Sequence, residues 1–480
     1  MNQTTIFDCL YPKYKITKPI RLIEFFAGYG SQALALKYLG VEFEHWKICE
    51  WAIKSIQAYK DIHFDNINFD FSGDLTKDNL VKVLYELGIS NNYNEPMTKQ
   101  QIERLNINQL KTIWNNIVTT KNLVNIQQAK GKDLEIVDTD KYDYILTYSF
   151  PCQDLSLAGK GKGMSDTTTR SGMLWEVERI LTECKELGTL PQILLMENVP
   201  QIHGADNVQD FNKWQLRLEE LGYKNYFQDL IATDYGIPQT RNRCFMISIL
   251  GDYSYTFPKP IPLKLKLKDM LEDNVDEKYY LSDKMLNCFL SESEDSKFPR
   301  KERFLQTFNI TNEKGIAATI TTCAGTRATD NFIKDTENYI EWKEKGKLDI
   351  DCRASKEDKV STTICTTPKN KVLIKNGKIK EDVGVMIIGN YSPSNHNSSK
   401  IVDKEYSAPI VMENHGTVTA TQTSDLKIRK LTPKECFRLM GVKDEDYEKC
   451  AKNQSDSSLY HLAGDSIVVN VLMAIFKEIL

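Results

Sequence analysis

Cys152 is the first residue whose type and position could support chemistry. It follows the apolar run "YDYILTYSF" and precedes the glycine- and lysine-rich loop "AGKGKG". Pro151 stiffens the backbone before it, and the lysines of the loop would lower the pKa of its thiol. A thiolate at the end of a strand can act as a nucleophile. The alternative is an inert cysteine packed in a core, which is common.

Glu197 is the second candidate, because it ends the apolar run "PQILLMENV". If this strand and the strand before Cys152 are neighbours, both side chains point into one cleft at the carboxyl edge of a sheet. Apolar surroundings would raise the pKa of the Glu197 carboxyl and let it hold a proton near neutrality. A helix cap or an ion pair is the alternative.

Arginines follow at alternate positions in "PQTRNRC", residues 238–244. Gln239, Arg241 and Arg243 share one face if this segment is extended. Alternate arginines suit a phosphate or a base carbonyl, and a surface salt bridge is the alternative.

A glycine turn near the N-terminus has the pattern of a nucleotide-binding loop. Gly28 and Gly30 in "EFFAGYG" follow a strand-like run, and Glu50 ends the next one. In doubly wound folds such an acid binds a ribose hydroxyl. The pattern suits any adenosine cofactor, and a plain strand-to-helix turn is the alternative.

These residues need a sheet to position them. Buried strands are expected at 20–26 and 43–50, each followed by a helix, which is the βαβ pattern of a doubly wound α/β fold. The polar, helical stretch 76–140 is interpreted as an insertion, after which strands resume at 142–150, 191–199 and within 221–250.

The sequence predicts three parts. Residues 1–250 form a catalytic α/β domain of Rossmann-like type, residues 251–427 a second, smaller and mostly β domain, and residues 428–480 helices that return to the first domain. Within the second part, three threonine-rich segments resemble one another: "AATITTC" (317–323), "STTICTT" (361–367) and "GTVTATQ" (416–422).

Composition limits the classes of protein. The 480 residues are 41% hydrophobic with a net charge of −4, which is typical of a soluble chain with a large core. No long apolar run and no signal pattern are present, so we expect a cytoplasmic protein without a membrane partner. The 11 cysteines form no C-x-x-C pair, and no metal site is expected. Nucleic acid is not excluded, because the lysine-rich, acid-free stretch after Lys359 is either a solvated loop or a phosphate-contacting face.

Taken in order, these motifs resemble the cytosine-C5 DNA methyltransferase family. The resemblance rests on "FFAGYG", "FPCQDLSLAGKGKG", "ENV", "QTRNR", "RKLTPKECFRLMG" and "AGDSIVVNV". It covers about residues 18–75, 142–250 and 428–480, and it implies the doubly wound methyltransferase sheet with a target-recognition domain at 251–427.

The resemblance implies the chemistry of the candidate residues. Cys152 would add to C6 of a cytosine that has been flipped out of the duplex, Glu197 would share a proton with N3, and Arg243 would hold the base carbonyl. Arg241 would support the catalytic site and Gln239 would brace it. The remaining substrate-binding residues would be Phe150, Gln153, Ser156 and Asn198.

S-adenosylmethionine is the implied cofactor. Glu50 would bind the ribose, Trp51 would stack on the adenine and Asp74 would meet the adenine amino group. Asp465, which stands where the family often has asparagine, would also contact the cofactor. The cofactor-binding set is completed by Phe26, Ala27, Gly28, Tyr29, Gly30, Leu75 and Pro151.

The implied partner is double-stranded DNA, and the enzyme is expected to be a monomer. It would belong to a restriction-modification system with a companion endonuclease, or act as an orphan or phage enzyme. An RNA cytosine methyltransferase and a catalytically silent DNA-binding relative are the alternatives of the same fold. A nicotinamide dehydrogenase would leave Cys152, Glu197 and both arginines without roles, and a cysteine hydrolase would need a histidine motif that is absent from the sequence.

Overall fold

The computed structural model describes residues 11–150, 172–280 and 428–480, together with the short pieces 309–311, 316–317, 319–320, 322, 331–334, 385–391 and 416–421. The predicted site residues Pro151, Cys152, Gln153 and Ser156 lie outside the described residues. The chain forms two compact units: Met1–Leu271 with Lys314–Ala324 and Pro433–Leu480, and Glu272–Glu313 with Gly325–Thr432.

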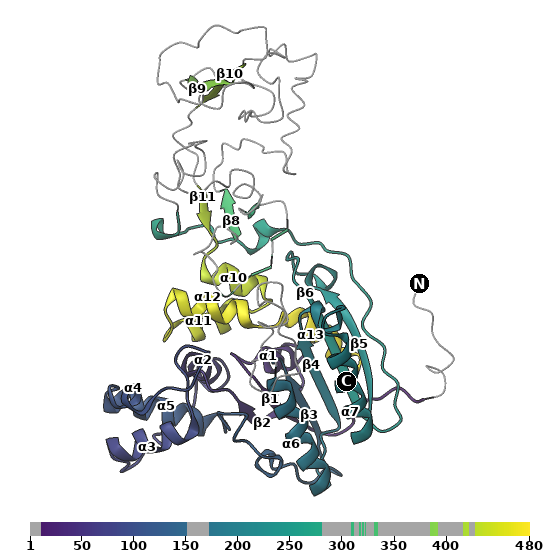
Figure 1. Cartoon of the computed structure of the whole chain (residues 1–480). Helices are drawn as coiled ribbons and strands as arrows, with labels where there is room; N and C mark the ends of the chain where they lie inside the picture. The colour runs from purple at the N-terminus through teal and green to yellow at the C-terminus, as the bar shows by residue number, and fades with distance from the viewer. Residues whose placement is uncertain are drawn as a thin grey trace. The chain divides into compact units, whose positions relative to one another are not determined.

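A six-stranded sheet is the centre of the first unit (Figure 1). Its strand order is β2-β1-β3-β4-β6-β5. The first four strands run parallel, whereas β6 is antiparallel to both β4 and β5. Their bounds are β1 Ile20–Phe25, β2 Phe43–Cys49, β3 Asp143–Tyr148, β4 Ile193–Asn198, β5 Tyr223–Ile231 and β6 Asn242–Leu250.

Helices cover both faces of this sheet. α6 (Met173–Leu187) and α7 (Val208–Leu221) pack on one face over a core that includes Leu146, Met196 and Trp214. Alternate strand residues point to the other face and are also buried. There α1 (Ser31–Tyr38) packs against α13 (Val469–Lys477). The remaining helices of this unit are α2 (Ile53–His63), α10 (Pro433–Leu439), α11 (Asp444–Ala451) and α12 (Asp456–Asp465).

The predicted insertion contains three helices, α3 (Lys77–Leu87), α4 (Lys99–Glu103) and α5 (Ile107–Thr119). Each begins at a capping box that the sequence carries locally, with Thr76, Thr98 and Asn106 as N-caps. The three helices bury their apolar faces together and against Ile56 of α2. The insertion is therefore a helical layer added beside α2.

The described part of the second unit contains short strands. β7 (Asn309–Thr311), β8 (Asn331–Lys334) and β11 (Ile428–Lys430) form one sheet, and β9 (Val385–Tyr391) pairs with β10 (Gly416–Thr421). Of the three threonine-rich segments, the third forms β10, whereas the second lies outside the described residues. Ala317 of the first makes a single bridge to Gln239 in the first unit.

The strands and helices expected around the glycine turn are confirmed, and the described residues of the second unit lie mainly in short strands. The compact units divide the chain differently from the predicted boundaries, because Gly251–Leu271 and Lys314–Ala324 belong to the first unit. One helical stretch, Asp456–Lys477, is long and apolar enough to cross a membrane, but 72% of its most apolar window is buried. Core helices of soluble proteins meet the same criterion.

Candidate active site

The end of β3, directly before Pro151, is joined to the end of β4. The side-chain amide of Asn198 donates a hydrogen bond of 3.1 Å to the carbonyl oxygen of Phe150, and both residues are buried. The two strands are parallel neighbours, which is the condition that the sequence analysis set for a shared cleft. Asn198 thus fixes the point from which the chain continues toward Cys152.

Glu197 and Arg243 form a buried ion pair at the same edge. Arg243 Nε lies 3.1 Å from Glu197 Oε1, and the two side chains are 19% and 10% exposed. Burial raises the pKa of Glu197, whereas the charges of Arg243 and Arg241 oppose this shift. The direction of this shift agrees with the expectation from the apolar run before it.

Arg241 and Gln239 connect this edge of the sheet to other segments of the first unit through hydrogen bonds. The guanidinium of Arg241 donates hydrogen bonds to the carbonyl oxygens of Ile320, Gly464 and Ser466. The buried amide of Gln239 donates to Leu439 O at 2.7 Å and accepts from Ile320 N at 2.9 Å. These contacts support the bracing roles of both residues. Both atoms of the Gln239 amide group bond to the protein itself, and this favours a bracing role over a contact with the substrate.

Replacing Arg241 with alanine is expected to lower the free energy of unfolding by about 3 kcal/mol, because three buried carbonyl groups lose a charged donor. Calorimetry should show this as a lower Tm. Arg104→Ala, at an exposed position after α4, is the control and should leave Tm unchanged. Equal Tm values for the two variants would contradict the bracing role.

The glycine turn lies beside a buried carboxylate, as predicted. Glu50 Oε2 accepts a hydrogen bond from Gly28 N at 3.0 Å, and Oε1 accepts one from Ala52 N at 2.8 Å. A Cβ atom on Gly28 would meet nothing within 4 Å, so space remains beside the turn. Gly30 is required for another reason: its φ is +82°, and a Cβ there would lie 2.4 Å from His63 Nε2.

Asn122 is a site residue that sequence reasoning missed. Its amide accepts a hydrogen bond from Glu50 N at 3.0 Å and donates one to Glu50 O at 2.8 Å. It follows α5, so the chain returns from the insertion directly to Glu50. The predicted Asp74 is exposed on a turn, where no contact with Glu50 is described. No local signal in the sequence could have identified a partner 72 residues away.

The other predicted cofactor residues differ in their surroundings. Phe26 and Ala27 belong to the turn, and the Phe26 N–H donates to Cys49 O at 2.8 Å. The ring of Tyr29 is fully buried and stacks on Phe437. Trp51 and Leu75 are half-buried against the core of the insertion.

Asp465 ends α12, and its side chain is 64% exposed. Its charge raises the pKa of both Glu50 and Glu197. Asp465 therefore lies close to both the glycine-turn site and the Glu197–Arg243 pair.

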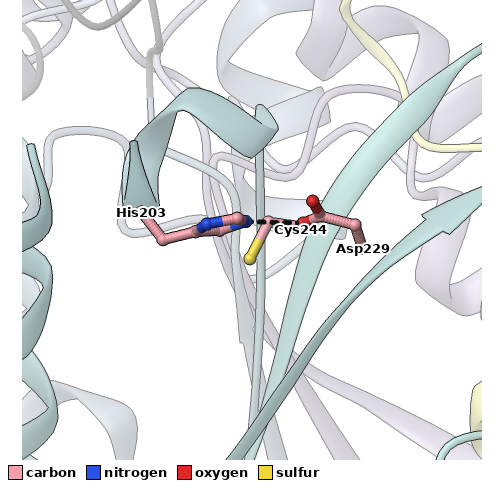
Figure 2. Close-up of side chains that lie close together, drawn as sticks. All are labelled: His203, Asp229 and Cys244. Atoms are coloured by element: carbon pink, nitrogen blue, oxygen red, sulfur yellow. Dashed lines mark hydrogen bonds and ion pairs between the residues drawn. The ribbon is translucent and has the colours of Figure 1, made fainter. Parts of the chain in front are cut away.

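A second cluster is formed by His203, Asp229 and Cys244 (Figure 2). Cys244 follows Arg243 and pairs with Asp229 of β5. The Asp229 carboxylate accepts a hydrogen bond from His203 at 2.9 Å and one from the Cys244 thiol, whose pKa is raised by burial and by Asp229. The three ligand atoms lie within 4.8 Å of one another and could hold a metal ion. The three side chains also account for one another, since Asp229 accepts a hydrogen bond from each of the other two. The cluster therefore leaves the expectation of no metal untested.

The fold is shared with solved methyltransferase structures. An Entamoeba histolytica methyltransferase, EhMeth, superimposes with a TM-score of 0.54 at 14% identity, covering 96% of this chain and 98% of that chain. The Dnmt2 methyltransferase of S. pombe gives a TM-score of 0.53 at 14% identity with the same coverage. At this identity the likeness defines the class of fold alone, a methyltransferase-type α/β sheet.

Sequence comparison defines the family. The model of the C-5 cytosine-specific DNA methylase family matches residues 85–480. The type II methyltransferase M2.ScrFI of Lactococcus lactis subsp. cremoris is 30% identical over 464 residues, 96% of this chain and 99% of that protein. The orphan methyltransferase M.SssI of Spiroplasma monobiae is 34% identical over 305 residues, 62% of this chain and 76% of that protein. The chain belongs to the C-5 cytosine-specific DNA methylase family and is a DNA (cytosine-5-)-methyltransferase.

Proposed function

We propose that this enzyme methylates a cytosine flipped out of a specific duplex DNA sequence, with Cys152 as the nucleophile and S-adenosylmethionine as the donor. The observation that carries the proposal is the meeting of Phe150, Asn198, Glu197 and Arg243 at one edge of the sheet. This edge is formed by the carboxyl ends of β3 and β4 and the start of β6, where ligands bind in open α/β sheets.

The residues act on the base in a fixed order. The Cys152 thiolate attacks C6 and forms a C–S bond, which moves electron density toward C5. Glu197 supplies the proton shared with N3, and Arg243 holds both that carboxyl and the base carbonyl. After C5 has gained the methyl group, an unassigned base removes its proton, the C–S bond breaks and the thiolate is restored.

The residues around the glycine turn fit the proposed donor. When bound, S-adenosylmethionine supplies a sulfonium-activated methyl group. The open space beside Gly28 admits a ligand next to the backbone. Glu50 has one hydrogen bond to each carboxylate oxygen, which leaves lone pairs for ribose hydroxyls. Trp51, Asp74, Leu75, Pro151 and Asp465 remain proposed contacts.

Donor binding should depend on pH through Glu50. Burial, followed by the charge of Asp465, raises the pKa of Glu50 to about 7, although N–H groups of Ala52, Gly28 and Trp51 oppose the shift. The ionised carboxylate is the better acceptor, so affinity is expected to rise as pH increases through this pKa and to fall below it. Calorimetric titration with S-adenosylhomocysteine on both sides of pH 7 measures the effect. Asp465→Asn should move the transition to lower pH, and an unchanged midpoint would contradict this assignment.

We infer that the second unit, Glu272–Glu313 with Gly325–Thr432, reads the DNA sequence. Family membership implies a DNA substrate, and the strands described in this unit offer side chains for a groove. The lysine-rich stretch after Lys359 lies outside the described residues. A monomer in the bacterial cytoplasm, acting beside a restriction endonuclease or alone, remains our prediction; both types occur by name among the relatives.

A mechanism-based trap tests the proposed function. The enzyme is incubated with donor and duplexes that carry 5-fluorocytosine, in which the C5 proton needed for release is replaced. We expect a denaturation-resistant protein–DNA conjugate that peptide mapping assigns to Cys152. Methylation of ordinary DNA without any such conjugate would overturn the nucleophile, and preferential methylation of RNA would overturn the substrate.

A further inference from the structure

A loop of the insertion reaches the site proposed for the donor. Residues 89–97 connect α3 to α4 and are closed at their base by the hydrogen bond from Met97 N to Ile89 O. Ser90 exchanges backbone hydrogen bonds with the segment directly after Glu50: its N–H donates to Trp51 O at 2.8 Å, and its carbonyl accepts from Ile53 N at 2.9 Å. The loop is thus fixed to the edge of the glycine-turn site.

Tyr93 lies at the tip of this loop in an unusual conformation. Its φ is +63°, a left-handed value that bulky residues rarely adopt. Asn92 stabilises the turn by accepting hydrogen bonds from Asn94 N and Glu95 N. Such strain persists where the surroundings enforce it, and it is often found at ligand sites.

The Tyr93 hydroxyl is buried, and it makes no hydrogen bond of ordinary geometry with the described residues. Ser55 and Ser458 lie near enough to lower its pKa, but burial and the charges of Glu50 and Asp465 outweigh them and raise it. A buried hydroxyl close to two carboxylates is therefore available to a ligand.

His461 of α12 forms the other half of this feature. Its ring contacts the Tyr93 ring in a tilted arrangement, with 3.8 Å between centroids and 43° between the ring planes. Its Nε2 atom is also buried without a hydrogen bond among the described residues, and Asp465 Oδ2 lies 3.8 Å away. Two aromatic side chains in contact, from distant parts of the first unit, thus bring two available polar atoms to the neighbourhood of Glu50 and Asp465.

We propose that Tyr93 and His461 line the donor site opposite Glu50. They would donate hydrogen bonds to the oxygens of the same ribose hydroxyl groups whose protons Glu50 accepts. This assignment rests on the proposed function of Glu50. Glu50 can only accept hydrogen bonds when ionised, so the ribose oxygens need donors of their own. The Tyr93 hydroxyl can supply one, and His461 Nε2 can supply another in the tautomer that carries its proton. The insertion then contributes directly to the methyl-donor site.

Tyr93→Phe tests the proposal, because it keeps the ring and its contact with His461 but removes the hydroxyl. Affinity for S-adenosylhomocysteine, measured by calorimetry on the full chain, should fall about 3- to 10-fold, the value of one hydrogen bond. KM for the donor should rise while kcat at saturating donor stays close to wild type. His461→Phe should weaken binding similarly. Tyr85→Phe, at an exposed position on α3, is the matched control and should bind as wild type.

The Tm of the ligand-free protein separates a binding role from a structural one. Because the Tyr93 hydroxyl has no described partner, Tyr93→Phe should leave this Tm unchanged or raise it. A lower Tm with unchanged affinity would overturn the proposal.

A second probe, 5′-methylthioadenosine, keeps the ribose but lacks the amino-acid end of the donor. If the hydroxyl contacts the ribose, the loss of affinity in Tyr93→Phe persists with this probe; if the loss disappears, the ribose assignment is wrong. Should the wild-type chain fail to bind either adenosine compound, the donor assignment itself falls. Normal binding by wild type and Tyr93→Phe alike would reject only the role of Tyr93.

Discussion

Replacing Cys152 with serine is expected to abolish methyl transfer, with a loss of at least about 10⁴-fold in turnover. A hydroxyl ionises far less readily than a thiol, so it cannot attack C6 at a useful rate. Incorporation of a labelled methyl group into duplex DNA measures the loss. Because the side chains are nearly the same size, binding of DNA and of S-adenosylhomocysteine should persist.

The control for this variant is Cys184→Ser. Cys184 is fully buried in α6, where its thiol donates to Gly131 O, and a hydroxyl can donate to the same carbonyl. Activity should remain in this variant. Near-normal turnover by Cys152→Ser would refute the assignment of the nucleophile.

Replacing Glu197 with glutamine should reduce turnover by about 10²- to 10⁴-fold, the usual contribution of an acid–base group. Glutamine keeps the shape of the side chain, but its amide has no carboxyl proton to share with N3. In the proposed mechanism the protonated carboxyl is the active form, and burial raises its pKa. Turnover should therefore decline as pH rises through this pKa, and the glutamine variant should lose that dependence.

A pH–rate profile of wild type and Glu197→Gln checks both statements. Glu219→Gln, on the exposed side of α7, serves as the control and should keep the wild-type profile. An unchanged rate in Glu197→Gln, or an unchanged decline with pH, would remove the proposed proton from the mechanism.

The framework around these residues was predictable because its signals are local. Apolar runs predict the buried strands, the glycine turn predicts the first βα unit, and the capping boxes mark where the insertion helices begin. The neighbouring positions of β3 and β4 were only a condition of the sequence argument, and the structure supplies them. The position of Cys152 itself is a sequence prediction, because it lies outside the described residues.

The parts that could not be predicted depend on contacts between distant residues. Asn122 is bonded to Glu50 across the whole insertion, and Tyr93 meets His461 from the other end of the first unit. Periodicity and spacing carry no information about such pairs. The prediction for Gly30 was incomplete for the same reason. A glycine was expected there to admit a ligand, and in the structure the missing side chain also makes room for His63.

Arg241 donates hydrogen bonds to the carbonyl oxygens of Gly464 and Ser466, which follow it by more than 200 residues. During synthesis, the glycine turn, Glu197 and Arg243 leave the ribosome long before these partners exist. A nascent chain would carry the reactive side chains without the support that aligns them. We therefore expect methyltransferase activity only after Ser466 has been translated. A ribosome-bound chain that is stalled before this residue should not methylate DNA.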